Sequence, residues 1–208
     1  MLAFKSILLL AFTWALAATA LPVSDGGNPK QPIILLPGQV VLRDLSKLDQ
    51  AVMRLTFKIN DKEGSFKKVK PIVDAFRAVD KANRRAIEDV QTVSETIDID
   101  SSQKIASLLT KDVAVDVRRA VKAVMKKKTK FEAVEARDLV LNALKRMKND
   151  HDNFSAKLME KMDNSTLVDG NAAVASISKA LDEGIERFSR RSSEVHPMED
   201  DGAESDSE

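Results

Sequence analysis

Histidine is the side chain that titrates near neutral pH, and this 208-residue chain has only two, His151 and His196. It has no cysteine or tyrosine, so it offers neither a thiol nor a phenol as nucleophile. Acid–base catalysis by His151 would need a partner nucleophile or paired carboxylates, and the clustered Asp98 and Asp100 have no spacing that selects them. GxSxG, P-loop and HExxH motifs are also absent. We therefore predict no enzyme, no cofactor and no bound metal, and we interpret His151 as a packed histidine four residues after Met147.

A second chemical feature is the basic run at residues 118–130 (RRAVKAVMKKKTK), which contains no acidic residue. Such a run can contact anionic lipid head groups, wall polyanions or nucleic acid. It can equally be a solvated helix face, because lysines near a helix C-terminus interact favourably with the helix dipole. The candidate contacts for an anionic surface are its seven basic residues, Arg118, Arg119, Lys122, Lys126, Lys127, Lys128 and Lys130.

The first twenty residues have the parts of a secretory signal peptide. Lys5 precedes the apolar stretch 7–18, and residues 18–20 (ATA) form a small-x-small pattern that predicts cleavage between Ala20 and Leu21. The apolar stretch is too short to span a bilayer stably as an uncleaved anchor. We predict a secreted protein, extracellular or in the cell wall, without a transmembrane segment. Secretion and the acidic C-terminus both argue against a nucleic-acid partner.

Residues 21–40 contain four prolines and three glycines, a density that predicts an extended arm. Its apolar patch at residues 33–36 (IILL) either docks on the folded domain, which we favour, or belongs to a segment that is removed on maturation. At the other end, residues 192–208 hold seven acidic residues and no basic one. We predict that the stretch 191–208 is a disordered acidic tail, and that it neutralises part of the basic run.

From Val41 to Phe188, apolar residues recur every three or four positions, which is the period of an amphipathic helix. No segment alternates as a β-strand would. The pattern predicts an all-α bundle of about five long amphipathic helices without disulfides, over residues 41–190. Breaks and caps place the helices: a break at Gly64-Ser65, Pro71 in the first turn of the second helix, Asp100-Ser101 capping the third, a fourth starting near Glu132, and Ser165 or Thr166 capping the fifth.

Two N-glycosylation sequons occur in the helical region, Asn153-Phe154-Ser155 and Asn164-Ser165-Thr166. Asn164 falls in a predicted turn and is the favoured acceptor. Asn153 lies within a predicted helix, so a glycan there requires its side chain to face solvent.

Three stretches of the helical region form a familiar pattern: RDLSKLDQAVMRLTFKINDKEG, KKKTKF and LVLNALKRMKNDHDNF. Together with the secreted, tryptophan-free helical body, they resemble the fungal hydrophobic surface-binding protein A family, also called cell wall galactomannoproteins. In that family a lysine pair followed by an aromatic residue separates two long helices, and Lys127, Lys128 and Phe131 fall at this point. The chain differs from the family in having an acidic tail in place of a long Ser/Thr-rich stalk.

The resemblance implies a non-enzymatic secreted protein that binds hydrophobic surfaces or carries a fatty acid or phospholipid between its helices. The alternative is a wall-associated glycoprotein or host-interaction protein that contacts a cell-wall polysaccharide or another secreted protein. A closed bundle with a cavity and a bundle that opens and spreads both remain possible, because methionine and aliphatic side chains repack at low cost. Candidate lipid or surface contacts on the second and fourth helices are Val73, Phe76, Leu144, Met147 and Leu158.

Overall fold

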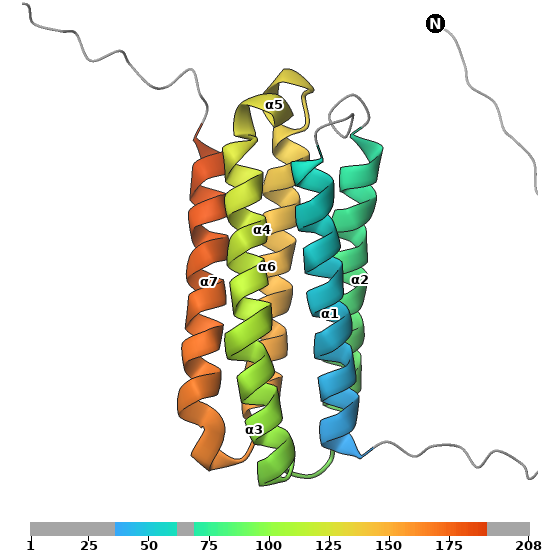
Figure 1. Ribbon diagram of the computed structural model, residues 1–208, viewed down its shortest axis with the longest axis vertical. Coiled ribbons are helices and arrows are strands. Elements are labelled where there is room, and N and C mark those ends of the chain that lie inside the picture. Colours follow the sequence, from blue (N-terminus) through green and yellow to red (C-terminus); the bar gives the residue numbers. More distant parts are fainter. Residues whose placement is uncertain (1–35, 62–68, 191–208) are drawn as a thin grey trace, which may run out of the picture. The chain divides into compact units, whose positions relative to one another are not determined.

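The computed structural model describes residues 36–61 and 69–190, and these residues form a bundle of long helices (Figure 1). The expected signal peptide, most of the expected arm, the Gly64-Ser65 break and the acidic tail lie outside the described residues. The predicted all-α bundle is confirmed. Its elements are α1 (Pro37–Asn60), α2 (Lys70–Gln91), α3 (Ile99–Leu108), the π-helical η1 (Leu109–Val113), α4 (Ala114–Lys126), the short α5 (Lys128–Ala133), α6 (Arg137–Met159), the 3₁₀ turn η2 (Asn164–Thr166) and α7 (Leu167–Ser189).

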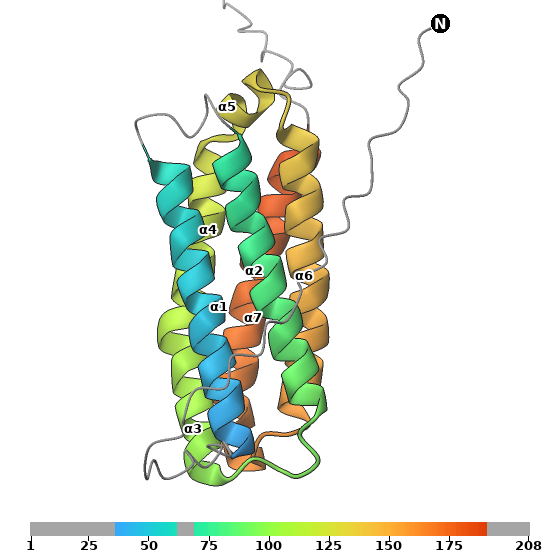
Figure 2. The ribbon, with the colours of Figure 1, turned by 90° about the vertical axis from the view of Figure 1, so that its right-hand side faces the viewer.

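Five long segments build the bundle, because α3, η1 and α4 follow one another without a break. Each segment packs on two neighbours in the order α1, α2, α6, α7 and α4, and α4 returns to α1. Figure 2 shows α1, α2 and α6 side by side from the face opposite to α7. The apolar stripes that predicted the helices therefore meet inside this ring and form one continuous core.

Helix α1 begins earlier than its apolar stripe, at Pro37. A proline suits the first turn of a helix, since its missing N–H would have no intrahelical partner there. Residues 37–40, which the sequence assigned to the arm, are therefore helical. The next residue, Gly38, lets α1 approach α3 closely: a Cβ atom at this position would lie 2.3 Å from the Cβ of Ser101.

Three predicted helix starts need correction. The third helix is capped by Asp98, whose Oδ1 accepts the backbone N–H of Ser101 at 2.8 Å. The fourth long helix starts at Arg137 instead of near Glu132. Between α5 and α6, Glu135 has a φ of 54°, a left-handed conformation that interrupts the helix.

The third correction concerns the start of α7, where neither Ser165 nor Thr166 caps the helix with its side chain and Asp163 caps the preceding turn. Asp163 accepts the backbone N–H of Ser165 at 2.9 Å and opens η2. Thr166 occupies the N-cap position of α7 but makes no side-chain cap bond there. Its hydroxyl donates to the carbonyl of Asp163 instead, at 2.8 Å. Pro71 lies in the first turn of α2 as predicted.

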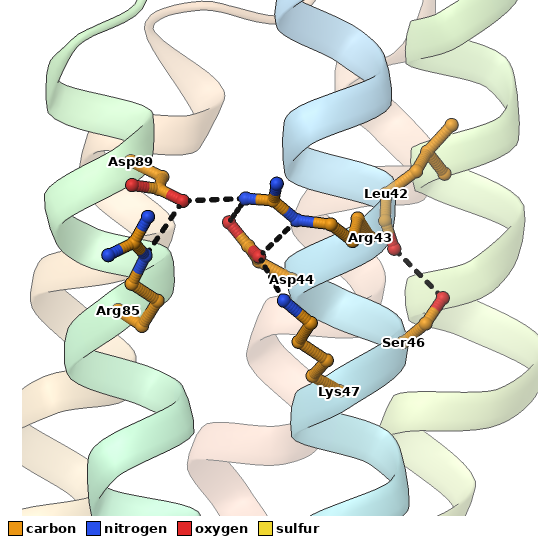
Figure 3. A network of polar contacts seen from close by, with 7 residues as sticks. All are labelled: Leu42, Arg43, Asp44, Ser46, Lys47, Arg85 and Asp89. Atoms are coloured by element: carbon orange, nitrogen blue, oxygen red, sulfur yellow. Dashed lines mark hydrogen bonds and ion pairs between the residues drawn. The ribbon is translucent and has the colours of Figure 1, made fainter. Parts of the chain in front are cut away.

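Helices α1 and α2 are also joined by a polar network (Figure 3). The guanidinium of Arg43 on α1 donates to Asp44 at 2.9 Å and to Asp89 of α2 at 2.8 Å. Asp89 also accepts from Arg85, at 3.0 Å. Asp44 is only 2% exposed, and its buried carboxylate is compensated by Arg43 and by Lys47, which lies 3.7 Å away. The network holds one end of the α1–α2 pair together.

Candidate functional site

A small cavity lies at the centre of the bundle, with a volume of about 30 Å³. A space of this size holds one or two water molecules. All five long segments contribute to its wall, which is mostly aliphatic. The lining residues are Leu45, Leu48, Val52, Val79, Asn83, Leu109, Val113, Val117, Met147, His151, Phe154, Ser155, Leu158, Val174, Ile177 and Leu181.

The cavity is much smaller than a site for a lipid. Pockets that bury drug-sized ligands measure roughly 300–1,000 Å³. The core around the cavity is closely packed, with Leu45, Val52 and Leu158 at most 1% exposed. An acyl chain can therefore enter this wall only if helices separate and the lining side chains repack.

Three polar residues interrupt the apolar wall: Asn83 on α2, and His151 and Ser155 on α6. All three are buried, at 5%, 9% and 5% exposure. His151 Nε2 lies 3.2 Å from the carbonyl oxygen of Val174, which can only accept a hydrogen bond, so Nε2 carries the proton. His151 Nδ1 is then free to accept from the Ser155 hydroxyl, 3.4 Å away.

The electrostatics of this polar group favour a neutral imidazole. Burial lowers the pKa of His151, against a smaller opposing effect of its hydrogen bond to the Val174 carbonyl. Lys148 also lowers this pKa, whereas Asp152 raises it. A neutral ring, a hydroxyl and an amide give the cavity hydrogen-bonding capacity without a fixed charge.

The predicted lipid contacts divide between the cavity and the surrounding core. Met147 and Leu158 line the cavity. Phe76 and Leu144 are buried, at 4% and 1% exposure, but do not line it. Val73 is half-buried on α2. His151, interpreted from the sequence as a packed histidine, is part of the wall.

The sequence analysis missed the contributions of α1, η1, α4 and α7. Every long helix carries an apolar stripe, and nothing in the sequence distinguishes the stripe positions that face a void. Asn83 and Ser155 were also missed. A signal for these two was present: Asn83 occupies an apolar position in the stripe of α2, and Ser155 follows His151 by one helical turn.

The predicted basic contacts differ in their surroundings and exposure. Arg118 and Lys122 line a groove between α4 and α7 together with Lys179, over a floor that includes Val121 and Met125. The other predicted residues in the run lie outside this groove: Arg119 pairs with Asp116 at 2.6 Å, Lys126 and Lys130 are exposed, and Lys127 is half-buried.

Lys128 differs most from the expectation of a surface contact, because it is only 5% exposed. Its ammonium donates to the carbonyl of Arg190 and pairs with Glu132 at 3.5 Å. It thereby ties α5 to the end of α7. Beside it, the buried rings of Phe131 and Phe188 meet edge-on, with centroids 6.1 Å apart. Lys128 and Phe131 of the family pattern thus build this end of the bundle.

Both sequon asparagines, Asn153 and Asn164, are exposed. Across residues 36–61 and 69–190, no cluster of three histidine, aspartate or glutamate side chains could hold a metal ion. Within the same ranges, no helix combines the length and the apolar character needed to cross a membrane.

Comparison with models of protein families shows to which family the chain belongs. The model of the family described as hydrophobic surface binding protein A matches residues 38–160, which is more than half of the sequence. The chain belongs to this family. The resemblance inferred from its helical motifs is thus confirmed. No curated protein matches the chain.

Solved structures share the fold of this family member. A structure of AfMP4p in complex with palmitic acid matches with a TM-score of 0.68 at 18% identity, over 73% of this chain and 99% of that one. Ligand-binding domain 1 of the Penicillium marneffei MP1 protein, complexed with arachidonic acids, matches with 0.68 at 15% identity, over 74% and 100%. Domain 2 of the same protein, with multiple arachidonic acids, gives 0.65 at 15% identity, over 74% and 96%.

Proposed function

We propose that this protein is a secreted, non-catalytic carrier that holds the acyl chain of a fatty acid or related lipid between its helices. The observation that carries the proposal is the apolar cavity at the centre of the bundle, to which all five long segments contribute. The fold adds support, since AfMP4p and the MP1 domains share it and are described with palmitic or arachidonic acid. Burying an acyl chain stabilises a complex by about 0.8 kcal/mol for each methylene removed from water.

The acyl chain enters by enlarging the small cavity. No disulfide restrains the helices, since the chain has no cysteine. Met147 and the aliphatic side chains around it can adopt new rotamers at low cost. The π-helical segment η1 supplies Leu109 and Val113 to the wall, and π-helical turns often mark functional positions in helices. Between the two mechanisms left open by the sequence, we favour limited separation of the helices within an intact bundle.

The polar group in the wall recognises the head of the lipid. A carboxyl group placed in an apolar core without partners would be strongly destabilised. Asn83 can donate from its amide, and the Ser155 hydroxyl can turn from His151 Nδ1 to donate to the head group, whereas the imidazole N–H stays bonded to the Val174 carbonyl. These side chains come from α2 and α6, so a bound head group would bridge two neighbouring helices.

Secretion and glycosylation belong to the same proposal. The predicted signal peptide and the family both support an extracellular or cell-wall location. The exposure of Asn164 and Asn153 supports modification of both sequons, with Asn164 favoured because it lies in the turn before α7.

Native mass spectrometry tests the carrier function. The mature chain is secreted from a eukaryotic host, purified without detergent, and measured before and after organic extraction. We expect an extractable mass in the fatty-acid or phospholipid range, and uptake of added palmitate by the extracted protein. A protein that carries no lipid and takes up no palmitate while its helical circular dichroism is intact would refute the proposal.

A further inference from the structure

The outer side of the α1–α2 pair carries an exposed apolar groove near the end opposite to the Arg43–Asp89 link. We call it the α1–α2 face. Its two largest apolar side chains, Met53 and Phe57, are 45% and 66% exposed and lie one helical turn apart. The residues that line the groove are Met53, Arg54, Phe57, Lys58, Pro71, Asp74, Ala75 and Ala78.

Phe57 is the one aromatic side chain in the lining of this face, and with Met53 it forms an apolar centre rimmed by charged groups, the arrangement found at membrane interaction sites. Pro71, Ala75 and Ala78 extend the apolar area from α1 onto α2. Because these side chains are small, they cover little of Met53 and Phe57. The groove is widely open to solvent, which suits the surface of a layer of molecules better than a single enclosed ligand.

Basic side chains surround the apolar centre. Arg54 and Lys58 flank Phe57 on α1, and the ammonium of Lys58 lies 5.7 Å from the centroid of the Phe57 ring. Asp74 is the acid in the groove lining, and Lys70 and Arg77 engage it at 2.6 and 3.5 Å. Four basic residues therefore stand around one carboxylate, so the face complements negative charge.

The two helices of the α1–α2 face also form part of the wall of the central cavity. Val52 and Val79 line the cavity, whereas their sequence neighbours Met53 and Ala78 line the groove outside. The same two helices thus present one side to the cavity and the other to solvent. A contact on the outer side acts directly on two of the helices that must move for an acyl chain to enter.

We propose that the α1–α2 face docks the protein on the surface of a lipid layer that carries negative charge. Phe57 and Met53 insert among the head groups, and Arg54, Lys58, Lys70 and Arg77 contact the anionic groups with their apolar stems lying along the surface. The inference rests on the proposed carrier function, since a carrier must meet the layer from which it takes its lipid.

Tryptophan fluorescence provides a direct test. Trp14, the one tryptophan of the chain, lies in the predicted signal peptide, so the mature chain provides a dark background. The variant F57W places a single fluorophore on the face. The matched control is V168W on α7, where the natural valine is 81% exposed. Each variant is titrated with vesicles of phosphatidylcholine alone and of phosphatidylcholine mixed with phosphatidylglycerol.

For F57W we expect a blue shift of emission and roughly tenfold stronger partitioning with phosphatidylglycerol, lost at high salt. V168W should show no shift. The double variant M53S/F57S, which changes only exposed positions, should bind vesicles roughly tenfold more weakly and still take up palmitate in solution. The charge variant R54E/K58E should lose the preference for phosphatidylglycerol.

Three results would overturn the docking proposal. The first is an equal emission shift for F57W and V168W, and the second is equal partitioning of F57W to neutral and anionic vesicles. The third is a blue shift of F57W without vesicles together with a dimer in native mass spectra, which would make a second copy of the chain the partner. Failure of the wild type to take up palmitate, with F57W docking as expected, would refute the carrier function and leave the docking surface.

Discussion

The central cavity and the α1–α2 face share helices α1 and α2, and they differ in what already covers their apolar side chains. Phe154 in the cavity wall is 3% exposed, whereas Phe57 on the outer face is 66% exposed. A lipid that enters the cavity must displace contacts that the core already makes. A lipid surface that meets the α1–α2 face displaces only water, so the burial of apolar area, about 25 cal/mol per Å², favours docking without such a loss. Docking on a lipid surface and uptake of a lipid can therefore be studied separately. Variants of the α1–α2 face test docking, and variants of the cavity wall test uptake.

The largest contrast is expected between F154A and F57A. Truncation of a buried phenylalanine costs about 3–5 kcal/mol of unfolding free energy, because apolar contacts are lost and a void remains. Truncation of the exposed Phe57 should change stability by less than about 0.5 kcal/mol. Urea unfolding followed by circular dichroism measures both. Equal losses would mean that Phe57 packs into the core and that the outer face does not exist as described.

This contrast also marks what the sequence could predict. The apolar periodicity predicted the helices well, because each stripe must be buried against another. It did not separate the stripe positions that face a 30 Å³ void from those packed on neighbours, since this depends on how five helices meet. The exposure of Phe57 follows from the same periodicity, because Phe57 lies two positions from Leu55 and from Ile59 and so falls off the buried stripe of α1.

The helix ends show the same limit. A stretch with several acceptors can be capped by any of them, and the choice of Asp98 over Asp100 depends on where the backbone enters the helix. Lys128 is the clearest case among the candidate contacts. A run of lysines predicts exposure, yet the fold places the carbonyl of Arg190 within reach of this one ammonium, and the side chain becomes buried.

A second, smaller effect concerns the polar group of the cavity. Replacing Asn83 with leucine or Ser155 with alanine should weaken palmitate binding roughly tenfold each, because a head group loses a donor in a buried site. Isothermal titration with delipidated protein measures the affinity. Asn171 on α7 is exposed and away from the cavity, so N171L is the control and should bind as the wild type does. Unchanged affinity in N83L and S155A would place the head group elsewhere, for example at a helix end.

A third prediction concerns the stability of the contact between α2 and α6, where two carboxyl groups are buried. Asp80 Oδ1 on α2 and Asp150 Oδ2 on α6 are buried and lack another hydrogen-bond partner among the described residues. Burial raises the pKa of Asp150, and its hydrogen bond with Asp80 raises it further. Since the folded chain then holds a proton that the unfolded chain has released, the unfolding free energy falls as pH rises above the ordinary carboxyl range near 4. The contact between α2 and α6 therefore contributes less to stability at neutral pH than at pH 4.

The variant D150N removes this charge and gives Asp80 an amide donor. We expect it to gain roughly 0.5–2 kcal/mol of stability at pH 7 and to lose the Asp150 part of the decline above pH 4, while Asp49, whose pKa burial also raises, keeps its own part. Thermal unfolding from pH 4 to 8 measures both. Asp152, which pairs with Lys148 at 2.6 Å on the exposed side of α6, gives the control D152N, where a small loss is expected. If D150N were no more stable than the wild type at pH 7, the two carboxyl groups would not share a proton.

The smallest expected effect comes from His151, and its sign is opposite. Burial lowers its pKa, so the unfolded chain takes up a proton first as the solution is acidified. The stability that the neutral ring contributes is fully present above the ordinary histidine value of about 6.5 and falls as pH decreases toward the lowered pKa. The variant H151Q keeps a donor for the Val174 carbonyl and an acceptor for Ser155 without titrating, so its unfolding free energy should not show this fall. The comparison is made between pH 7.5 and 5 by urea unfolding in the D150N background, which removes the opposing contribution of Asp150 and leaves that of Asp49 common to both chains. A wild-type ring that causes no loss below pH 6.5 in that background would be accessible to water, and the polar end of the cavity would then be open without any separation of the helices.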